Sequence, residues 1–594
     1  MIPISQDELA RWRAEIDLGV EFREKEFGTY QKQQPGGEPI TSGAGKNLEY
    51  YEMGARTDDG ISPPVNLIYA IVKNVVPTLF YQNPRATAIP EAISGADAAD
   101  DAFYVSELIN RDVRDPDFRF KETGQLTTFD AYVLAVGLVK IGYSTEMGPD
   151  VLPTDADKRK KLKEKFRDAV DNVLEQVGLK QPPTELEELE PIQVQADSSI
   201  KSERAYVQWI SPFDFAIDPR ARDITDALWV AQRIRRTLGA IKRDKRYGRA
   251  KYELKPEQIE EDRIPETFIE EFQAVDIWEV HYKTLESPTG IRVLTFASTQ
   301  DQTKQLMHED SEYDLGGWQY EWLVQNKHGH RLWPISTLSI IRPLLDRINS
   351  SFDAVLEQLD KFVAKVVYND RMTPDGEEAL KTGVIGAKVK LTGSESVQGA
   401  VAVVSMDQVK ADIMALINQV IDIVILITGL TRAQLTGLTT AQTATEAQIG
   451  QSGQNLRRTD EANQVADWVN RVITKLWRVK AQFEDFEDVY LVKDTQLLNP
   501  ATGVSSAQWY PPIDAQRAMR LKQNRFKFHT EASSMQKPNP EIIRAQFQQF
   551  VGQLMQPIVT QGLALEGKRL SASEIIRQFG ILFSESGLQS NLNK

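Results

Sequence analysis

Two short motifs contain residue types that support enzyme chemistry. Gly43-Ala44-Gly45-Lys46 has the glycines and the lysine of a phosphate-binding loop, but the spacing to a first glycine is missing and Asn47 stands where such loops carry Ser or Thr. His328-Gly329-His330 offers two imidazoles without a third nearby ligand or the helical spacing of a zinc site. We interpret the first motif as a loop and the second as a turn, and expect neither ATP binding nor a metal site.

The sequence gives little support for other kinds of catalytic site. The chain contains no cysteine, which excludes disulfides, thiolate metal sites and cysteine nucleophiles and fits folding in a reducing cytoplasm. No Gly-x-Ser-x-Gly element occurs. Acidic residues are abundant, but the sequence does not show which of them meet in space. We therefore predict a protein that is not an enzyme and needs no cofactor, with a DNA-processing enzyme as the least favoured alternative.

A cluster of basic residues is the best local candidate for a nucleic-acid surface. It consists of Arg233, Arg235, Arg236, Lys242, Arg243, Lys245, Arg246 and Arg249, with Asp244 among them. We expect it on a short surface helix, and the alternative is a solvated face or a set of salt-bridge donors between subunits. The formal net charge of the whole chain is −15, which opposes tight nonspecific DNA binding but suits a conduit in which a duplex moves freely.

The elements that must position these residues are mostly helical, and we predict an α+β fold. The 594 residues suggest roughly four structural units. Ser5 and Glu8 form a capping-box pattern at the start of a helix that runs to about Tyr30. Helical patterns follow at 66–80, 97–114 and 127–136, and strand patterns at 138–143, 206–210 and 275–298. A charged stretch at about 150–204 reads as a peripheral insertion.

Membrane insertion and secretion are not expected. Residues 1–10 lack the basic-then-apolar pattern of a secretion signal. The longest nearly uninterrupted apolar run, 423–427, is far shorter than the roughly 20 residues that span a bilayer.

The most regular pattern is a heptad seam that predicts one long helix with an apolar packing stripe. Its members alternate spacings of four and three: Ile341, Leu345, Ile348, Phe352, Val355, Leu359, Phe362 and Val366. A second stripe contains Met406, Val409, Ile413, Leu416, Val420, Val424 and Ile427. Glycine and threonine then dominate 429–445, and a further long helix is predicted at 446–483.

Several runs resemble the portal proteins of tailed bacteriophages, the head-to-tail connectors. They are 66–84 (NLIYAIVKNVVPTLFYQNP), 130–143 (DAYVLAVGLVKIGY) and 209–219 (WISPFDFAIDP), the last followed by Trp229 and Arg233. The order of the later elements is also similar to this family, because two helices flank a short segment and precede a small-residue loop and another long helix. The resemblance covers most of the chain.

The resemblance implies a wing, stem, clip and crown architecture that assembles into a ring with a central channel. It assigns 1–334 to the wing, 335–367 to a first stem helix, 368–405 to the clip and 406–428 to a second stem helix. The loop at the channel constriction would be 429–445, the rest of the wing 446–534, and the crown with a polar tail 535–594. The clip is short for this family, which leaves its boundaries open.

The resemblance also implies particular residues and partners. The candidate tunnel-loop residues are Thr431, Arg432, Thr436, Gly437, Thr439 and Thr440, although a plain interhelical linker is the alternative. Lys361 and Lys365 are candidate channel-lining residues that touch phosphates transiently, or else ordinary exposed lysines. The expected partners are copies of the same chain, twelve by resemblance, together with double-stranded DNA, a terminase, the major capsid or scaffolding protein, and head-completion and tail adaptor proteins. The expected location is the virion, with assembly in the host cytoplasm, and another virion structural or adaptor protein is the alternative.

Overall fold

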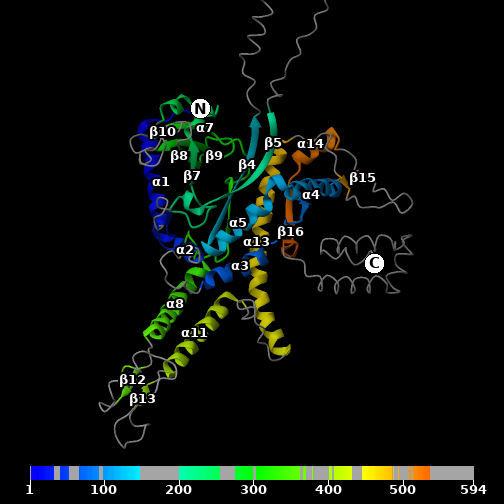
Figure 1. Ribbon diagram of the computed structural model, residues 1–594. Coiled ribbons are helices and arrows are strands. Elements are labelled where there is room, and N and C mark those ends of the chain that lie inside the picture. Colours follow the sequence, from blue (N-terminus) through cyan, green and yellow to red (C-terminus); the bar gives the residue numbers. More distant parts are fainter. Residues whose placement is uncertain are drawn as a thin grey trace, which may run out of the picture.

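The computed structural model describes residues 2–31, 40–52, 66–91, 98–147, 200–254, 274–298, 303–361, 365–368, 378, 401–404, 407–430, 444–484, 486, 492–493, 508–509 and 513–535. This part of the chain is α+β, as predicted, with more residues in helices than in strands. It forms a body from which a long arm extends, made of α8 (Thr337–Lys361) and α11 (Asp407–Thr428) (Figure 1). The predicted crown beyond Met535 and most of the predicted charged insertion lie outside the described residues.

The first helix, α1 (Gln6–Glu26), begins as its sequence predicts. The Ser5 side chain accepts a hydrogen bond from the backbone N–H of Glu8 at 3.2 Å, which caps the helix. The helix ends before the predicted Tyr30, because Gly28 takes a φ of 113° and packs so closely on Ser42 that no side chain fits there. Tyr30 instead starts β1 (Tyr30–Gln31), which pairs with β2 (Ile40–Thr41).

The body contains seven further α-helices within the described ranges. They are α2 (Gly45–Glu52), α3 (Leu67–Leu79), α4 (Ala98–Arg114), α5 (Phe120–Val133), α7 (Leu238–Arg243), α13 (Ala444–Phe483) and α14 (Ala515–Gln523). Short 3₁₀ helices lie at η2 (Pro116–Phe118), η4 (Pro212–Asp214), η5 (Arg249–Glu253) and η8 (Ala532–Met535). The helix expected at 127–136 therefore starts earlier, at Phe120.

A five-stranded antiparallel sheet forms one side of the body, in the order β10-β9-β8-β7-β6. Its strands are β6 (Phe215–Ile217), β7 (Trp229–Thr237), β8 (Ala274–Lys283), β9 (Ile291–Ser298) and β10 (Thr303–Asp310). Helix α1 covers one face, where Leu9 and Ile16 are buried with Trp229 and Phe296. The basic cluster was expected on a helix, but Arg233, Arg235 and Arg236 lie in β7, and only Lys242 and Arg243 lie in α7.

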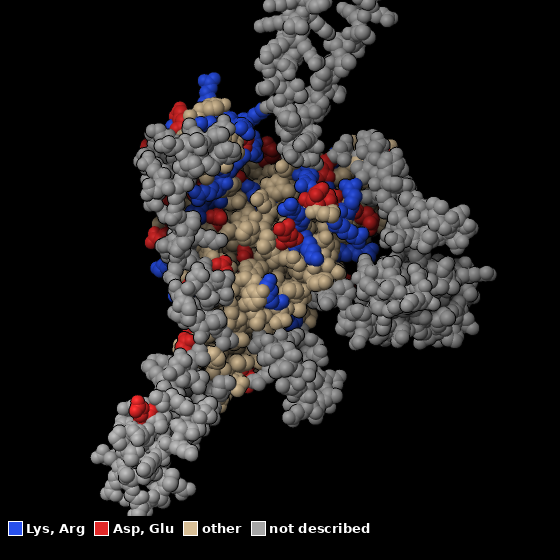
Figure 2. Space-filling view, viewed as in Figure 1, with Lys and Arg blue, Asp and Glu red and all other residues tan. Residues whose placement is uncertain are grey.

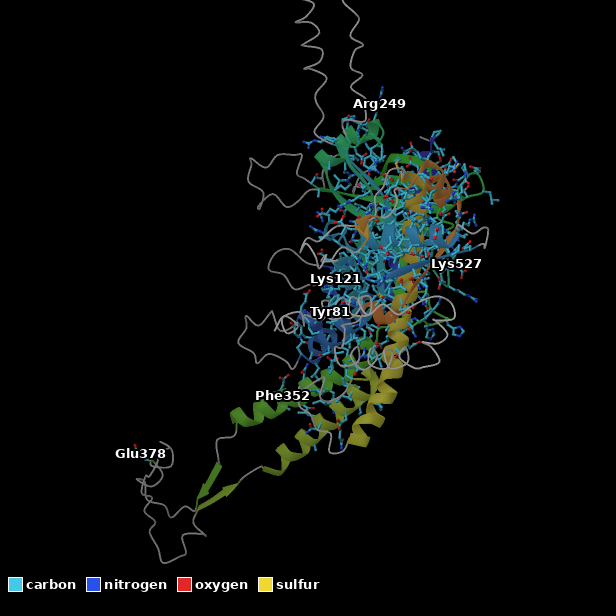
Figure 3. The ribbon with its side chains drawn as sticks, turned by 90° about the vertical axis from the view of Figure 1, so that its right-hand side faces the viewer. Tyr81, Lys121, Arg249, Phe352, Glu378 and Lys527 are labelled. Carbon is cyan, nitrogen blue, oxygen red and sulfur yellow. The ribbon has the colours of Figure 1, made fainter. Side chains whose placement is uncertain are left out.

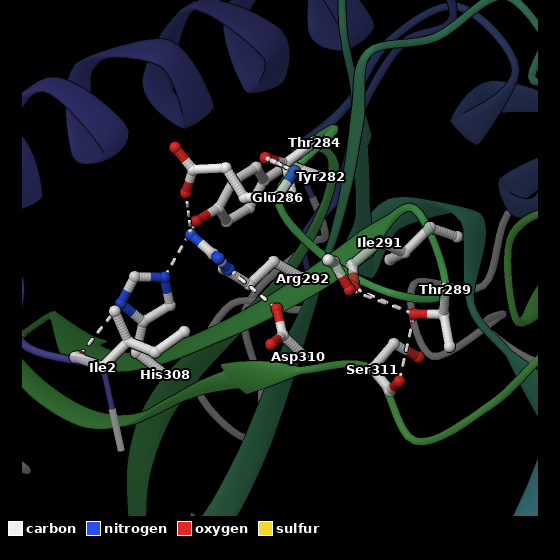
Figure 4. A network of polar contacts seen from close by, with 11 residues as sticks. Ile2, Tyr282, Thr284, Glu286, Thr289, Ile291, Arg292, His308, Asp310 and Ser311 are labelled. Carbon is white, nitrogen blue, oxygen red and sulfur yellow. Dashed lines mark hydrogen bonds and ion pairs between the residues drawn. The ribbon is translucent and has the colours of Figure 1, made fainter.

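The start of the chain is tied to the outer strand of this sheet (Figure 4). The Ile2 backbone N–H donates to the carbonyl of His308 at 2.7 Å, and the Ile2 carbonyl lies 3.1 Å from His308 Nδ1. Beside it, Arg292 on β9 pairs with Asp310 on β10 at 2.9 Å and with Glu286 at 3.0 Å. These contacts hold the outer edge of the sheet together.

A three-stranded sheet in the order β11-β4-β5 lies next to α5 and α13. It consists of β4 (Val136–Met147), β5 (Ile200–Ile210) and β11 (Tyr320–Val324). Arg204 pairs with Ser144 in this sheet, so the charged insertion predicted to reach 204 ends before Ile200, where β5 begins. Six more strands of the described residues form small antiparallel pairs: β3 (Ala86–Pro90) with β16 (Phe526–Thr530), β12 (Lys365–Tyr368) with β13 (Val401–Val404), and β14 (Val492–Lys493) with β15 (Gln508–Trp509).

The long helix α13 crosses the body and organises its main core. Val465, Trp468, Val472 and Leu476 are fully buried along one of its faces. The buried Lys480 of α13 adds a polar attachment. It pairs with Asp112 of α4 and with Glu484, the residue that follows α13. No helix in the described ranges has both the length and the apolar content needed to cross a bilayer.

Candidate functional site

The arm is the candidate functional element, and its root is attached to the body by polar contacts around the start of α8. The Ser336 hydroxyl donates to the carbonyl of Tyr132 at 2.8 Å. Arg342 donates to the carbonyl of Gly43 at 2.8 Å and to the side chain of Asn47 at 2.9 Å. The Gly43–Lys46 motif is therefore part of the packing surface that receives α8. Its interpretation as a loop is correct for Gly43 and Ala44 but wrong for Gly45 and Lys46, which begin α2.

The predicted seam on α8 divides into a buried and an exposed part. Ile341, Leu345 and Ile348 are 0 to 2% exposed and belong to the main core, whereas Phe352 one turn further out is 36% exposed. Val355 and Leu359 lie on the same helix, but the structure does not describe their side chains. Phe362 lies outside the described residues. The apolar stripe thus continues onto a part of the arm that the body does not cover.

The end of the predicted first stem helix is wrong. Helix α8 ends at Lys361, and the next described residues form β12, so Lys365 and Val366 lie in a strand instead of on a helix. Val366 pairs with Val403 of β13, and β-branched residues on both sides favour such a ribbon over a helical turn. The pairing joins the chain that follows α8 to the chain that precedes α11, so residues 365–367 belong to a strand and not to the predicted helix.

Helix α11 carries apolar residues on two faces, and only one of them is buried. Ile417, Val420 and Val424 are 8%, 8% and 0% exposed and share the main core with the root of α8. The second face, which we call the outer face of α11, consists of Leu416, Ile423 and Leu426, which are 42%, 43% and 71% exposed. The two faces adjoin around the helix, and an apolar surface this broad is typical of a helix packed against more than one neighbour.

This arrangement corrects one detail of the predicted second stripe. Leu416 was expected among the residues of a single packing stripe, but Ile417 takes the buried position and Leu416 faces outward. The helix boundaries agree closely with the expected 406–428, since α11 spans Asp407–Thr428.

The inner end of α11 is held by α13. Gly429 adopts a φ of 67° and its N–H donates to the carbonyl of Ile425 at 2.9 Å, which ends the helix. Arg458 on α13 donates to the carbonyl of Thr428 at 2.9 Å and pairs with Glu461 at 2.6 Å. A cation at this position also complements the negative end of the helix dipole.

The segment between these two helices starts beside a buried residue. Leu430 is 3% exposed, and the chain is described again from Ala444 at the start of α13. The predicted tunnel-loop residues Thr431, Arg432, Thr436, Gly437, Thr439 and Thr440 lie between them, outside the described residues. The predicted long helix from 446 begins two residues earlier, at Ala444, and ends at the expected Phe483.

Beside the root of the arm lies a cleft of about 1250 Å³ that the sequence did not suggest. Its lining includes Glu321 from β11 and Arg471 and Lys475 from α13. Lys475 pairs with Glu321 at 2.8 Å and donates to the carbonyls of Trp318 and Tyr320 at 2.6 and 3.1 Å. Burial lowers the pKa of Lys475, although Glu321 opposes this effect. These charges are engaged in joining α13 to the sheet.

The cleft also borders His328 of the predicted turn. The His328 and His330 rings are 5.9 Å apart, and the His330 N–H donates to His328 Nδ1 at 3.3 Å. Among the described residues, no three histidine or acidic side chains gather in a way that could hold a metal ion. The pair is thus a local turn contact in this structure.

A buried carboxylate joins two of the runs on which the family resemblance rests. Asp130 at the end of α5 accepts a hydrogen bond from Nε1 of Trp209 on β5 at 2.8 Å. Burial raises the pKa of Asp130 to about 7, and the Trp209 hydrogen bond only partly offsets this effect. The contact lies in the body, where it connects α5 to the three-stranded sheet.

Comparisons with known proteins do not assign the chain to a family. No protein-family model matches the sequence, and no curated protein matches it.

Proposed function

We propose that the chain is a subunit of a bacteriophage portal, a ring at one capsid vertex through which double-stranded DNA enters during packaging and leaves during ejection. In this proposal α8 and α11 are the stem, the β12–β13 ribbon begins the clip, and α13 belongs to the wing. The ring contains twelve copies, as in the family that the sequence resembles. It docks a terminase during packaging and head-completion or tail adaptor proteins afterwards, and it contacts the major capsid or scaffolding protein.

The outer face of α11 is the observation that carries the proposal. One copy of the chain leaves Leu416, Ile423 and Leu426 exposed on a helix whose adjoining face is already buried. The arm that carries α11 extends away from the body (Figures 1 and 3). A neighbouring copy offers the continued α8 stripe, beginning at Phe352, as a different surface. Two unlike surfaces on each subunit are what a closed ring requires.

The junction between α11 and α13 supports a second part of the proposal. Arg458 holds the end of α11 to α13, so the 431–443 segment starts at the inner end of the proposed stem and leads to the start of α13. A segment rich in glycine and threonine can touch a moving duplex without a strong hold on it. We assign the tunnel loop to this segment, with Arg432 as its single basic side chain.

The charge of the chain suits free movement of DNA. With −15 on each copy, a twelve-membered ring carries roughly −180 before counterions, and we expect a predominantly negative channel. Phosphates are then repelled along most of the channel and meet only isolated cations.

Negative-stain electron microscopy of the purified full-length chain tests the proposal. We expect rings with a central hole. Sheets, tubes or a uniform population of monomers would contradict it, and sheets or tubes would favour another virion structural protein. ATP turnover or metal-dependent DNA cleavage by the purified chain would favour an enzyme.

A further inference from the structure

Residues 2–5, which we call the strap, meet the outer edge of β10 just before α1 begins (Figure 4). The Ile2 backbone N–H donates to the carbonyl of His308 at 2.7 Å, and the Ile2 carbonyl accepts from Nε2 of Gln305 at 3.0 Å. Ile4 packs against the apolar core between α1 and the five-stranded sheet. The strap therefore covers part of an edge strand, whose backbone groups can otherwise pair with another strand.

His308 connects the strap to the sheet through both nitrogens of its ring. The residue is 3% exposed, with Nδ1 3.1 Å from the Ile2 carbonyl oxygen and Nε2 2.8 Å from the Tyr282 hydroxyl. A carbonyl oxygen only accepts hydrogen bonds, so the proton of the neutral ring lies on Nδ1, and Nε2 accepts from the Tyr282 hydroxyl. The neutral ring thus satisfies both contacts while the strap is in place.

A second proton on His308 would disturb this arrangement. It would lie on Nε2, so the hydrogen bond with the Tyr282 hydroxyl would have to reverse its direction. It would also place a cation near Arg292 on β9. That guanidinium is fixed by ion pairs with Asp310 at 2.9 Å and Glu286 at 3.0 Å (Figure 4). The closed strap therefore favours the neutral ring.

The surroundings of His308 lower its pKa from the usual value of about 6.5. Burial is the main cause, because it disfavours the charged ring, and the hydrogen bond to the Ile2 carbonyl opposes it. Arg292 adds to the lowering, whereas the carboxylates of Glu8 on α1 and Asp310 on β10 oppose it. If the strap leaves, water reaches the ring and the pKa returns toward its usual value. Opening of the strap is thus coupled to uptake of a proton.

The strap is the element beside His308 that opens most easily. Ile2 ties it to β10 through three hydrogen bonds, two with His308 and one with Gln305. Strand β10, in contrast, is paired with β9 from Thr303 to Asp310. Local opening involves the parts of a fold with the fewest stabilising contacts. Acidification should therefore release the strap before it separates the strands.

We propose that the strap and His308 form a pH-sensitive closure on the edge of the five-stranded sheet, closed at neutral pH and released from β10 on acidification. The closed form is fully favoured above about pH 6.5 and loses this advantage as the pH falls, because the open form takes up the proton more readily. Release frees the His308 carbonyl on an edge strand, where another strand can pair. The inference does not depend on the proposed portal function.

The reaction of a thiol in the strap with N-ethylmaleimide measures opening in the full-length chain. The chain contains no cysteine, so Ile4→Cys supplies a single site, at a side chain that is partly buried. Its reaction rate is divided by that of N-acetylcysteine at the same pH, which removes the pH dependence of the thiol itself. Between pH 8.0 and 5.5 we expect this ratio to rise by up to about tenfold, because an open-form pKa of about 6.5 sets that limit.

This pH range isolates the imidazole. Lys, Arg, Asp and Glu side chains all lie on the face of the body shown in Figure 2. Carboxyl groups usually titrate near pH 4, and lysine and arginine above about pH 10, so their charges change little in this range. Among the described side chains at the strap, His308 is the one whose charge is expected to change.

Two further variants, both made with Ile4→Cys, assign the effect to His308. His308→Gln removes the titrating group but keeps a donor and an acceptor, so we expect the same ratio at both pH values. The matched control, His529→Gln, removes an exposed imidazole from β16 and should keep the full pH response. Circular dichroism at both pH values checks that each variant is folded.

A rise that occurs only in the proteins that retain His308 supports the inference. Two results would overturn it. One is a ratio that does not change with pH in the chain that carries Ile4→Cys alone. The other is an equal rise in His308→Gln, which would assign the effect to another group, such as the buried His281 of β8.

Discussion

Paired substitutions on the outer face of α11 test whether that face is covered by a neighbouring copy. Leu416 and Ile423 are 42% and 43% exposed and lie seven residues apart, so they are adjacent on one side of the helix. We expect Leu416→Ala with Ile423→Ala to weaken ring assembly, and Leu416→Asp with Ile423→Asp to prevent it. Both changes are made at exposed positions, so each subunit should still fold.

The size of the effect follows from the exposed fractions. Full burial of a Leu or Ile side chain contributes about 2 kcal/mol, and the two residues together still expose a little less than one whole side chain. A neighbour that covers them completely gains about 2 kcal/mol per contact, which corresponds to a factor of about 30 in its association constant. The aspartate pair loses this burial free energy and also brings unpaired carboxylates into the contact between subunits.

Mass photometry over a range of protein concentrations measures the effect. The alanine pair should move the assembly midpoint to higher concentration, and the aspartate pair should leave subunits only. The control pair is Leu285→Asp with Met519→Asp, which places the same charges on exposed apolar residues away from the arm, 105% and 62% exposed. If the aspartate pair on α11 forms the same rings as this control, the outer face is not a subunit contact and the reasoning fails.

Three further predictions concern the core of the body and the seam of α8. Because the pKa of Asp130 is raised to about 7, the folded state holds the Asp130 proton more tightly than the unfolded chain, and stability is lost as the pH rises from about 4 through about 7. Relative to Asp130→Asn, the unmodified chain should lose about 3 kcal/mol of unfolding free energy between pH 5 and 8, measured by urea unfolding. Parallel pH profiles of the two proteins would contradict this prediction. Glu321→Gln should lower the free energy of unfolding by about 3 kcal/mol, because it leaves Lys475 without its carboxylate; an unchanged urea midpoint would show that the pair is unimportant. Replacing both Phe352 and Leu359 with aspartate should abolish rings in negative stain, and intact rings would show that the seam is not a packing surface.

Much of the helical framework was predictable from local patterns. Apolar residues spaced three and four positions apart predicted the ends of α11 to within one residue and those of α13 to within two. This works because a helix repeats every 3.6 residues whatever it packs against. The Ser5 cap was equally local, because it needs only the backbone N–H three residues later. The strand 138–143 also matched, although β4 extends beyond it at both ends.

Features that depend on partners distant in the chain were not predictable. The pairing of β3 with β16 joins segments more than 400 residues apart, and nothing in 86–90 alone indicates it. Residues 365–368 continued a heptad pattern, yet their pairing with 401–404 outweighs it. The same applies to the basic cluster, because a β-ladder with β8 places Arg233, Arg235 and Arg236 on a strand.

The two apolar helices of the arm, α8 and α11, show most clearly which features are local to the sequence and which depend on tertiary packing. The sequence by itself determined that both helices form and that each is rich in apolar residues, because periodicity and composition are properties of the local chain. Only the tertiary structure decided that Ile417 turns inward and Leu416 outward, that α8 gives way to a strand, and that Arg458 secures the end of α11. Which face of a helix is buried depends on the rotation imposed by its neighbours, and burial of one face is what reveals that another has been left exposed.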